Sequence, residues 1–444
     1  MAGWLIKNAE LVNEGRRFQA DLRIRDQRIA EIGGDLDARA GEQVFDASRL
    51  WLLPGMIDDH VHFREPGYTA KADIASESRA AVAGGVTSFI DMPNTKPATL
   101  THDLLEDKYA VASRTSLANY AFYFGASNDN LGAIRALDPH KVPGVKVFLC
   151  ESTGNLCVSD PAALDGVFRE SPVTVVVHCE DSHIIHANLD RAKAEYGDDI
   201  PMHLHPEIRS REACFESTKW AVDTARRHGT RLHVLHVSTA DELALFEPGP
   251  IANKKITAET CVHFLRYCDA DYATLGGRIK CNPAIKAASD REALTRALTD
   301  TRIDILATDH APHLASEKDN PYTRCPSGIP LIQFALQSAL ETVFKQRLTL
   351  ERLVQAYAHA PATLFAIDGR GYLREGYFAD LTLINPNKPQ IVRRDQVLSK
   401  CGWSPFEGDT FHASVAATFV NGNLAARDGK VLDTPQGMRL QFDR

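Results

Sequence analysis

The stretch LPGMIDDHVHFREPG occupies residues 53–67 and combines an apolar run, two histidines one residue apart, an arginine and a Pro-Gly turn. Side chains alternate between the two faces of a β-strand, so His60 and His62 point the same way, and Arg64 follows on that face if the strand continues. Two imidazoles on one face can bind one metal ion. On this pair alone, two ordinary buried or surface histidines remain the alternative interpretation.

After this stretch, apolar runs alternate with helical patterns as far as about Phe365. Eight apolar runs are strand candidates. The first lies within residues 53–67, and the others occupy residues 86–92, 121–125, 145–149, 173–178, 232–237, 255–260 and 303–309. Strands that alternate with helices predict parallel βαβ units, and eight of them predict an α/β fold of the TIM type, a closed (β/α)₈ barrel.

Short strands and turns replace this pattern at both ends of the chain. Strand patterns occupy residues 4–9, 21–25 and 28–32 before the barrel and residues 379–384 and 416–422 after it. Because the two ends flank the barrel, we expect them to pair into one small β-sandwich. The sequence therefore predicts a barrel at residues 55–366, with the sandwich built from residues 1–54 and 367–444.

Composition narrows the class of protein. The chain has 444 residues with 44% hydrophobic and 24% charged, as in ordinary globular proteins. A net charge of −8 without a Lys/Arg block argues against nucleic acid, and no apolar run approaches the roughly 20 residues of a membrane helix. The N-terminus lacks a signal-peptide pattern, and nine scattered cysteines without a CxxC pair fit reduced thiols. We expect a soluble, cytoplasmic protein.

Polar residues close most of the predicted strands, at the barrel face where function is found. They are His60 and His62 on the first strand, Asn94 after the second, Lys146 in the fourth, His178 ending the fifth, His236 near the end of the sixth and Asp309 ending the eighth. Taken singly, His178 could be a buried histidine bonded to a carbonyl, and Asp309 could cap a helix or turn. His233 lies an odd number of residues before His236, so we expect only His236 to face the barrel interior.

Four imidazoles and one carboxylate at one rim suit zinc or a similar divalent ion. These five candidate ligands exceed the four that one tetrahedral ion binds, so we expect two metal ions. Two neighbouring cations need an anion between them, and the fourth strand offers no acid. Lys146 is costly inside an apolar strand unless its charge is paired or removed. Its amine would provide the anion if it has captured carbon dioxide as a carbamate, an inference that rests partly on the resemblance described next.

Several motifs resemble those of dihydroorotases of the amidohydrolase superfamily, and the similarity covers nearly the whole chain. The motifs are HVHFREPG at residues 60–67, MPNT at 92–95, VHCED at 177–181, HVST at 236–239, ATDHAPH at 307–313 and GWSPF at 402–406. Two departures stand near the seventh strand. Residues 262–264 read VHF where many relatives have Pro-His-His, and residues 281–284 read CNPA where Asn-Pro-Pro is common.

The resemblance implies a homodimer or larger homo-oligomer that hydrolyses (S)-dihydroorotate reversibly to N-carbamoyl-L-aspartate, in de novo pyrimidine biosynthesis. It also implies two divalent ions, most simply Zn²⁺, and assigns their ligands. His60, His62 and Asp309 would bind the more buried ion, His178 and His236 the other, and a carbamate on Lys146 would bridge them with a hydroxide. Some relatives have an aspartate bridge, and Lys146 places this chain with the lysine-bridged branch.

The mechanism expected from this resemblance is attack of the bridging hydroxide on the ring amide, with Asp309 moving the proton to the leaving nitrogen. Arg64 offers a planar fork for the ring carboxylate, although a salt bridge to Glu65 or another acid is the alternative. Asn94, Asn282 and His313 would share this recognition, and the loop at residues 313–330 could close as a lid. Competing functions are a hydantoinase or allantoinase, or a catalytically inactive scaffold.

Overall fold

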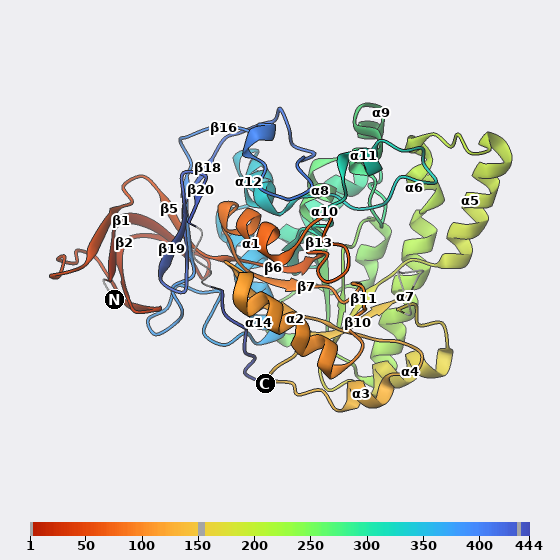
Figure 1. The fold of residues 1–444 in the computed structure, drawn as a ribbon, viewed down its shortest axis with the longest axis horizontal. Helices are drawn as coiled ribbons and strands as arrows, with labels where there is room; N and C mark the ends of the chain where they lie inside the picture. The colour runs from red at the N-terminus through yellow and green to blue at the C-terminus, as the bar shows by residue number, and fades with distance from the viewer. Residues whose placement is uncertain (1–2, 150–155, 433–436) are drawn as a thin grey trace.

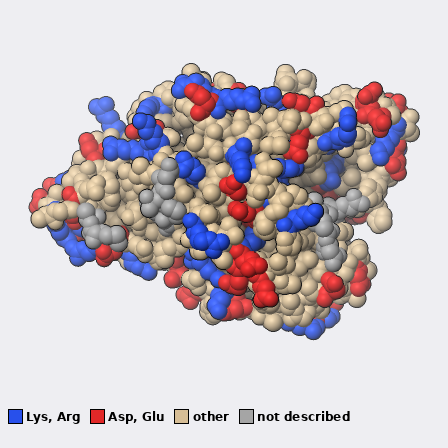
Figure 2. All heavy atoms as spheres, in the orientation of Figure 1, with Lys and Arg blue, Asp and Glu red and all other residues tan. Residues whose placement is uncertain are grey.

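The computed structural model describes residues 3–149, 156–432 and 437–444. Figure 1 shows a barrel surrounded by helices, with a separate sheet on one side that contains both early and late strands of the chain. The predicted α/β barrel class is confirmed by the strand order described below. Figure 2 shows basic and acidic side chains interspersed over the visible face. No helix in the described ranges has the length and hydropathy needed to cross a bilayer.

The barrel wall consists of parallel strands at eight positions, of which the third is divided in two. The strands are β6 (Met56–Val61), β7 (Val86–Asp91), β8 (Asn119–Phe122), β9 (Phe124–Gly125), β10 (Gly144–Phe148), β11 (Thr174–His178), β12 (Leu232–Val234), β13 (Ile256–Cys261) and β14 (Ile305–Ala307). They pair in the orders β6-β7-β8 and β9-β10-β11-β12-β13-β14. A parallel bridge between Val61 and His310 joins the last strand position to the first, so the barrel closes.

Helices follow most strands and cover the outside of the barrel (Figure 1). They are α1 (Ile74–Ala83), α2 (His102–Thr115), α3 (Leu131–Arg135), α4 (Pro161–Glu170), α5 (Ser182–Tyr196), α6 (His205–Ile208), α7 (Arg211–His228), α8 (Val262–Arg266), α9 (Tyr272–Leu275), α10 (Ala288–Thr299), α11 (Ala315–Lys318), α12 (Ala335–Phe344), α13 (Leu350–Val354) and α14 (Ala360–Phe365). Local sequence sets their ends. The Asp73 side chain accepts from the Ser76 amide at the start of α1, and α7 stops at Gly229, whose φ of 70° is left-handed.

A nine-stranded sheet joins the two ends of the chain. Its strands are β1 (Trp4–Asn13), β2 (Arg16–Arg25), β3 (Arg28–Gly33), β4 (Gln43–Asp46), β5 (Trp51–Pro54), β15 (Leu381–Asn385), β18 (Ser414–Val420), β19 (Asn423–Arg427) and β20 (Lys430–Val431). The sheet has its own apolar core, in which Leu52, Leu383 and Phe419 are fully buried. Strand β5 pairs with β1 and β15 and leads through Gly55 directly into β6. The sheet therefore anchors the strand that carries the paired histidines.

A buried ion pair holds the carboxyl end of β7 against α2. Lys108 Nζ lies 2.6 Å from Asp91 Oδ2, with both side chains 1% exposed. Asp91 Oδ1 accepts from the backbone N–H of Phe63 at 2.7 Å, next to His62. We predict that Lys108→Met lowers the free energy of unfolding by about 3–5 kcal/mol, because it leaves a buried carboxylate without its counter-ion.

Urea unfolding measures this loss. The matched control is Lys219→Met, which removes the lysine of a half-exposed pair with Asp223 on α7. That change should have little effect, since exposed ion pairs contribute little to stability. Equal unfolding midpoints for the two variants would contradict the prediction.

Candidate functional site

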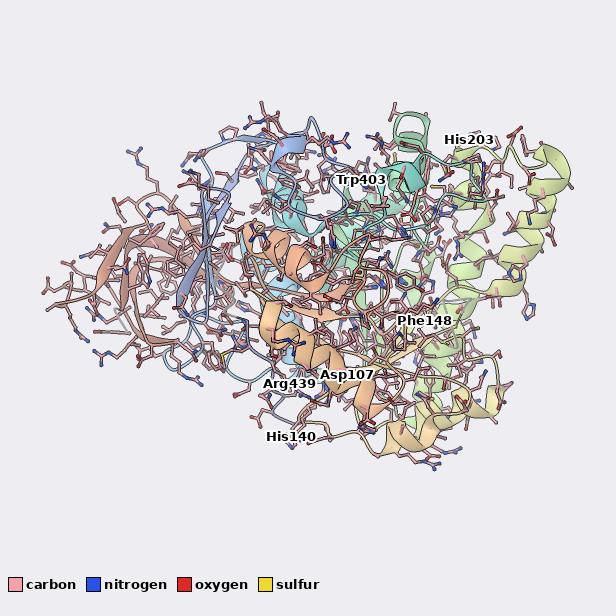
Figure 3. All side chains as sticks on the ribbon, viewed as in Figure 1. Asp107, His140, Phe148, His203, Trp403 and Arg439 are labelled. Atoms are coloured by element: carbon pink, nitrogen blue, oxygen red, sulfur yellow. The ribbon has the colours of Figure 1, made fainter. Side chains whose placement is uncertain are left out.

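One cavity of about 430 Å³ opens at the carboxyl ends of the barrel strands. All ten residues predicted for the site line it: His60, His62, Arg64, Asn94, Lys146, His178, His236, Asn282, Asp309 and His313. The cavity is also lined by Phe148 at the end of β10, by Arg209, and by residues 326–328. Phe148 is labelled in Figure 3, on the side of the barrel near β10 and β11. Barrel closure therefore gathers residues from strands and loops far apart in the sequence.

The first pair of histidines converges on Asp309. The Nε2 atoms of His60 and His62 lie 3.2 Å and 3.1 Å from Asp309 Oδ1. Their Nδ1 atoms lie 2.8 Å from oxygen acceptors, Glu259 Oε1 for His60 and Asn94 Oδ1 for His62. An acceptor at Nδ1 places a proton there and turns Nε2 toward Asp309 as the atom that would bind a metal.

The second pair comes from β11 and the segment after β12. His178 Nδ1 and His236 Nε2 lie 2.8 Å apart, and the two rings meet at 82°. His178 Nε2 lies 2.8 Å from Glu180 Oε2, which also accepts from Arg209 Nη1. Burial alone would raise the pKa of Glu180, but Arg209 and His178 lower it to about 2. The ionised Glu180 therefore holds the proton of His178 on Nε2 and leaves Nδ1 available as a ligand.

For His62, His178, His236 and Asp309 the electrostatics favour the protonation states that bind metals, whereas the pKa of His60 is raised, because Glu259 and Asp309 outweigh the effect of burial. Burial lowers the pKa of His62 to about 4 and lowers the pKa values of His178 and His236 as well. Burial would raise the pKa of Asp309, but the neighbouring His60 and His62 more than offset this and lower it. Neutral imidazoles and an ionised carboxylate are the forms in which these side chains bind divalent ions. The ligand atoms of His60, His62 and Asp309 all lie within 4.8 Å of one another, so this donor set fits a metal ion.

Lys146 lines the cavity close to members of both histidine pairs. It is in the middle of β10 and only 1% exposed, with Nζ 4.6 Å from the centre of the Phe148 ring. Its positive charge contributes to lowering the pKa values of both His178 and His236, from the second pair, and it acts in the same direction on His60, from the first. A lysine amine buried beside both pairs is therefore placed where an anionic bridge between two ions would be needed.

Arg64 lines the cavity, but strand alternation is not what positions its side chain there. Strand β6 ends at Val61, and Arg64 has a left-handed φ of 66°, so strand alternation does not place it. Its Nε donates to the Pro312 carbonyl at 3.1 Å, and its Nη2 lies 3.0 Å from His313 Nε2. The suggested partner Glu65 instead accepts from the Ile74 amide. The guanidinium is thus directed into the cavity beside His313.

Asn282 lines the cavity, and Trp403 contacts a residue that lines it. The Oδ1 atom of Asn282 is buried, and no hydrogen-bond partner for it exists among the described residues. Trp403, from the GWSPF motif and labelled in Figure 3, donates from Nε1 to the His313 carbonyl at 2.7 Å. The C-terminal motif therefore holds the backbone of a residue that lines the cavity.

The prediction for His233 was wrong. Its ring lies inside the barrel, with Nε2 3.5 Å from carboxylate oxygens of both Asp59 and Glu259, and it is fully buried. Strand β12 ends at Val234, and His236 adopts a left-handed φ of 40°. Alternation therefore stops before His236, and both histidines reach the interior.

Sequence reasoning missed Glu259, Glu180, Arg209 and Lys71. Glu259 is fully buried in β13. A charged side chain inside an apolar strand is costly unless it is paired, so Glu259 could have been identified from the sequence in the same way as Lys146. Glu180 lies within the VHCED motif, two residues after His178, whereas no sequence pattern marks Arg209.

In the proposed lid, Lys318 Nζ donates to the Lys280 and Pro326 carbonyls. Closure of residues 313–330 stays a prediction.

Comparison with known proteins places these features in context. The Amidohydrolase family profile matches residues 51–425. A dihydroorotase of Halobacterium salinarum is 34% identical over 95% of this chain and 96% of its own length. An allantoinase of Bacillus velezensis is 31% identical over 96% and 94% of the two chains. An L-hydantoinase (dihydropyrimidinase) structure from Arthrobacter aurescens covers 99% of this chain and 100% of its own, with a TM-score of 0.93 and 28% identity.

Proposed function

The chain belongs to the amidohydrolase family, and we propose that it is a dihydroorotase, which hydrolyses the cyclic amide of (S)-dihydroorotate reversibly to N-carbamoyl-L-aspartate in pyrimidine biosynthesis. The observation that carries this proposal is Arg64, whose guanidinium faces the cavity beside His313. A guanidinium fork binds a carboxylate through two parallel hydrogen bonds. Dihydroorotate has a ring carboxylate, whereas hydantoin, dihydrouracil and allantoin do not.

We assign His60, His62 and Asp309 to one divalent ion and His178 and His236 to a second, with zinc the best match to these donors. A carbamate on Lys146 would provide the negative charge between them. When bound, such ions lower the pKa of water and polarise the carbonyl of the ring amide. The hydrogen bonds that Glu259 accepts from His60 and that Glu180 accepts from His178 support this assignment, because they orient the rings.

Asp309 is the residue we assign to proton transfer. His60 and His62 keep its carboxylate ionised, and its left-handed φ of 49° turns the side chain toward both rings. An ionised carboxylate at the floor of the cavity can accept the proton of the attacking water and deliver it to the departing ring nitrogen.

Asn94 lines the cavity and is hydrogen-bonded to a proposed metal ligand. Its Oδ1 is engaged by His62 at 2.8 Å, so its amide nitrogen is left as a donor toward the substrate. We propose that Asn94, Asn282 and His313 bind the ring together with Arg64. Asn94 then contacts both a metal ligand and the substrate.

The second candidate function is hydrolysis of a neutral ring, which relatives named allantoinase and L-hydantoinase favour. The test compares kcat/KM on dihydroorotate, hydantoin, dihydrouracil and allantoin with one metal-loaded preparation. We expect dihydroorotate to be preferred by about 10²-fold or more, since a site built to bind a charged group rejects analogues that lack it. Preference for a neutral ring would overturn the proposal. A purified protein without bound divalent metal would instead support an inactive scaffold.

A further inference from the structure

A lysine outside the cavity contacts the ring of His313. Lys71, just before α1, is not among the residues that line the cavity. Its Nζ lies 2.9 Å from His313 Nδ1 and 2.9 Å from Glu317 Oε1. The Lys71 side chain is 22% exposed and that of His313 is 10% exposed. The ammonium is therefore held in place by Glu317 and directed at one ring nitrogen.

This contact determines where the proton of His313 resides. An ammonium has donors and no acceptor, so Nδ1 must accept, and the proton of a neutral ring lies on Nε2. The ring is neutral because burial, with Arg64 and Lys71 nearby, holds the pKa of His313 far below its usual range. His313 Nε2 lies 3.0 Å from the Ser327 carbonyl, an acceptor that suits an Nε2–H group.

The position of that proton affects Arg64. Arg64 Nη2 lies 3.0 Å from His313 Nε2, so two donors stand side by side. Neither can accept from the other. Because the Ser327 carbonyl accepts from Nε2, Arg64 Nη2 is the donor left for an oxygen in the cavity. With the proton on Nδ1 instead, Nε2 would accept from Arg64 and the guanidinium would be tied to the protein.

We propose that Lys71 is a positioning residue for substrate selection: by donating to His313 Nδ1 it keeps the proton on Nε2, so that Nε2 does not accept from Arg64 and the guanidinium stays available to a carboxylate. Lys71 itself touches no substrate. The identity of that carboxylate rests on the proposed function, whereas the position of the His313 proton does not.

Steady-state kinetics test the effect on selection. Lys71→Met should raise KM for dihydroorotate about tenfold or more, the loss expected for a weakened hydrogen bond to a charged group. The kcat for dihydroorotate and both constants for the neutral ring dihydrouracil should change little. Lys71→Arg should retain the wild-type KM, because guanidinium also only donates.

The control variant is Lys400→Met, which removes another ammonium near α1. Lys400 pairs with Asp73 and is 41% exposed, and none of its hydrogen bonds or ion pairs to described residues involves His313. This variant should behave as wild type. Equal losses on dihydroorotate and dihydrouracil in Lys71→Met, or failure of Lys71→Arg to retain activity, would show that Lys71 is only structural and overturn the proposal.

Nitrogen-15 NMR of histidine-labelled, metal-loaded enzyme gives a readout that does not depend on turnover. The chain has 17 histidines, so the His313 signals are assigned by their loss in His313→Asn. We expect the proton on Nε2 in wild type and on Nδ1 in Lys71→Met. A wild-type proton on Nδ1, or no change in Lys71→Met, would overturn the inference. If wild type fails to turn over dihydroorotate, the proposed function fails while this readout still decides the role of Lys71.

Discussion

Replacing Lys146 with alanine should reduce kcat/KM by about 10³-fold or more, because losing an orienting partner of a metal ligand already costs 10–100-fold and Lys146 is proposed as a ligand itself. Lys146 is buried in β10 and lines the cavity that holds both histidine pairs. Without an anion there, two cations would repel across the gap. We therefore expect elemental analysis to show fewer divalent ions per chain in Lys146→Ala than in wild type.

Chemical rescue distinguishes a bridging carbamate from a structural lysine. A short carboxylic acid such as propionate should restore part of the activity of Lys146→Ala, because it can occupy the vacated space and supply a carboxylate. Lys146→Met is the matched control, since its side chain fills that space without providing a ligand, and it should not be rescued.

Labelling with ¹³C-bicarbonate provides a direct test. A carbamate carbon signal should appear in wild type and be absent from both variants. Full metal content and activity in Lys146→Ala, or an unmodified amine in active wild type, would contradict the assignment.

Replacing Arg64 with methionine should lower kcat/KM on dihydroorotate by about 10²-fold or more, while metal content stays unchanged. Removing one partner of a buried charge pair costs about 2–5 kcal/mol, which sets this magnitude. Arg64 donates to the Pro312 carbonyl and contacts His313, and among the described residues it makes no hydrogen bond to a proposed metal ligand. Turnover of neutral rings should be maintained.

Arg209→Met is the matched control for this prediction, because it removes the other guanidinium that lines the cavity. Arg209 donates to Glu180, which in turn contacts His178. Its loss should therefore act through the metal ligands and reduce turnover of acidic and neutral rings alike. Full activity of Arg64→Met on dihydroorotate would show that the carboxylate is bound elsewhere.

Local sequence patterns were sufficient to predict the barrel and the positions of its polar strand ends. The run at residues 173–178 illustrates this: a threonine and three valines form the buried strand β11, and His178 ends it. The chain after this strand forms the helices α5, α6 and α7, of which α7 ends at His228 before Gly229. Such patterns are informative because burial and capping depend on near neighbours in the sequence.

Prediction was weaker wherever a strand ended early. Alternation placed His60 and His62 on one face, and both rings do reach Asp309. The same argument was wrong for His233, since β12 is only three residues long and His236 lies beyond it with a left-handed backbone. It also did not explain Arg64, which lies past the end of β6. Alternation holds only while the extended backbone continues.

By itself, the sequence determined the barrel class, the rim on which the histidines gather and the kinds of donor atoms available there. Only the tertiary structure decided which nitrogen of each histidine ring in the site is hydrogen-bonded to a neighbouring side chain. Glu259 contacts His60 across 199 residues of chain, and Lys71 contacts His313 across 242. The physical reason is that ring protonation depends on a neighbour within hydrogen-bond distance. These neighbours come from other strands and loops, and closing the barrel brings them together.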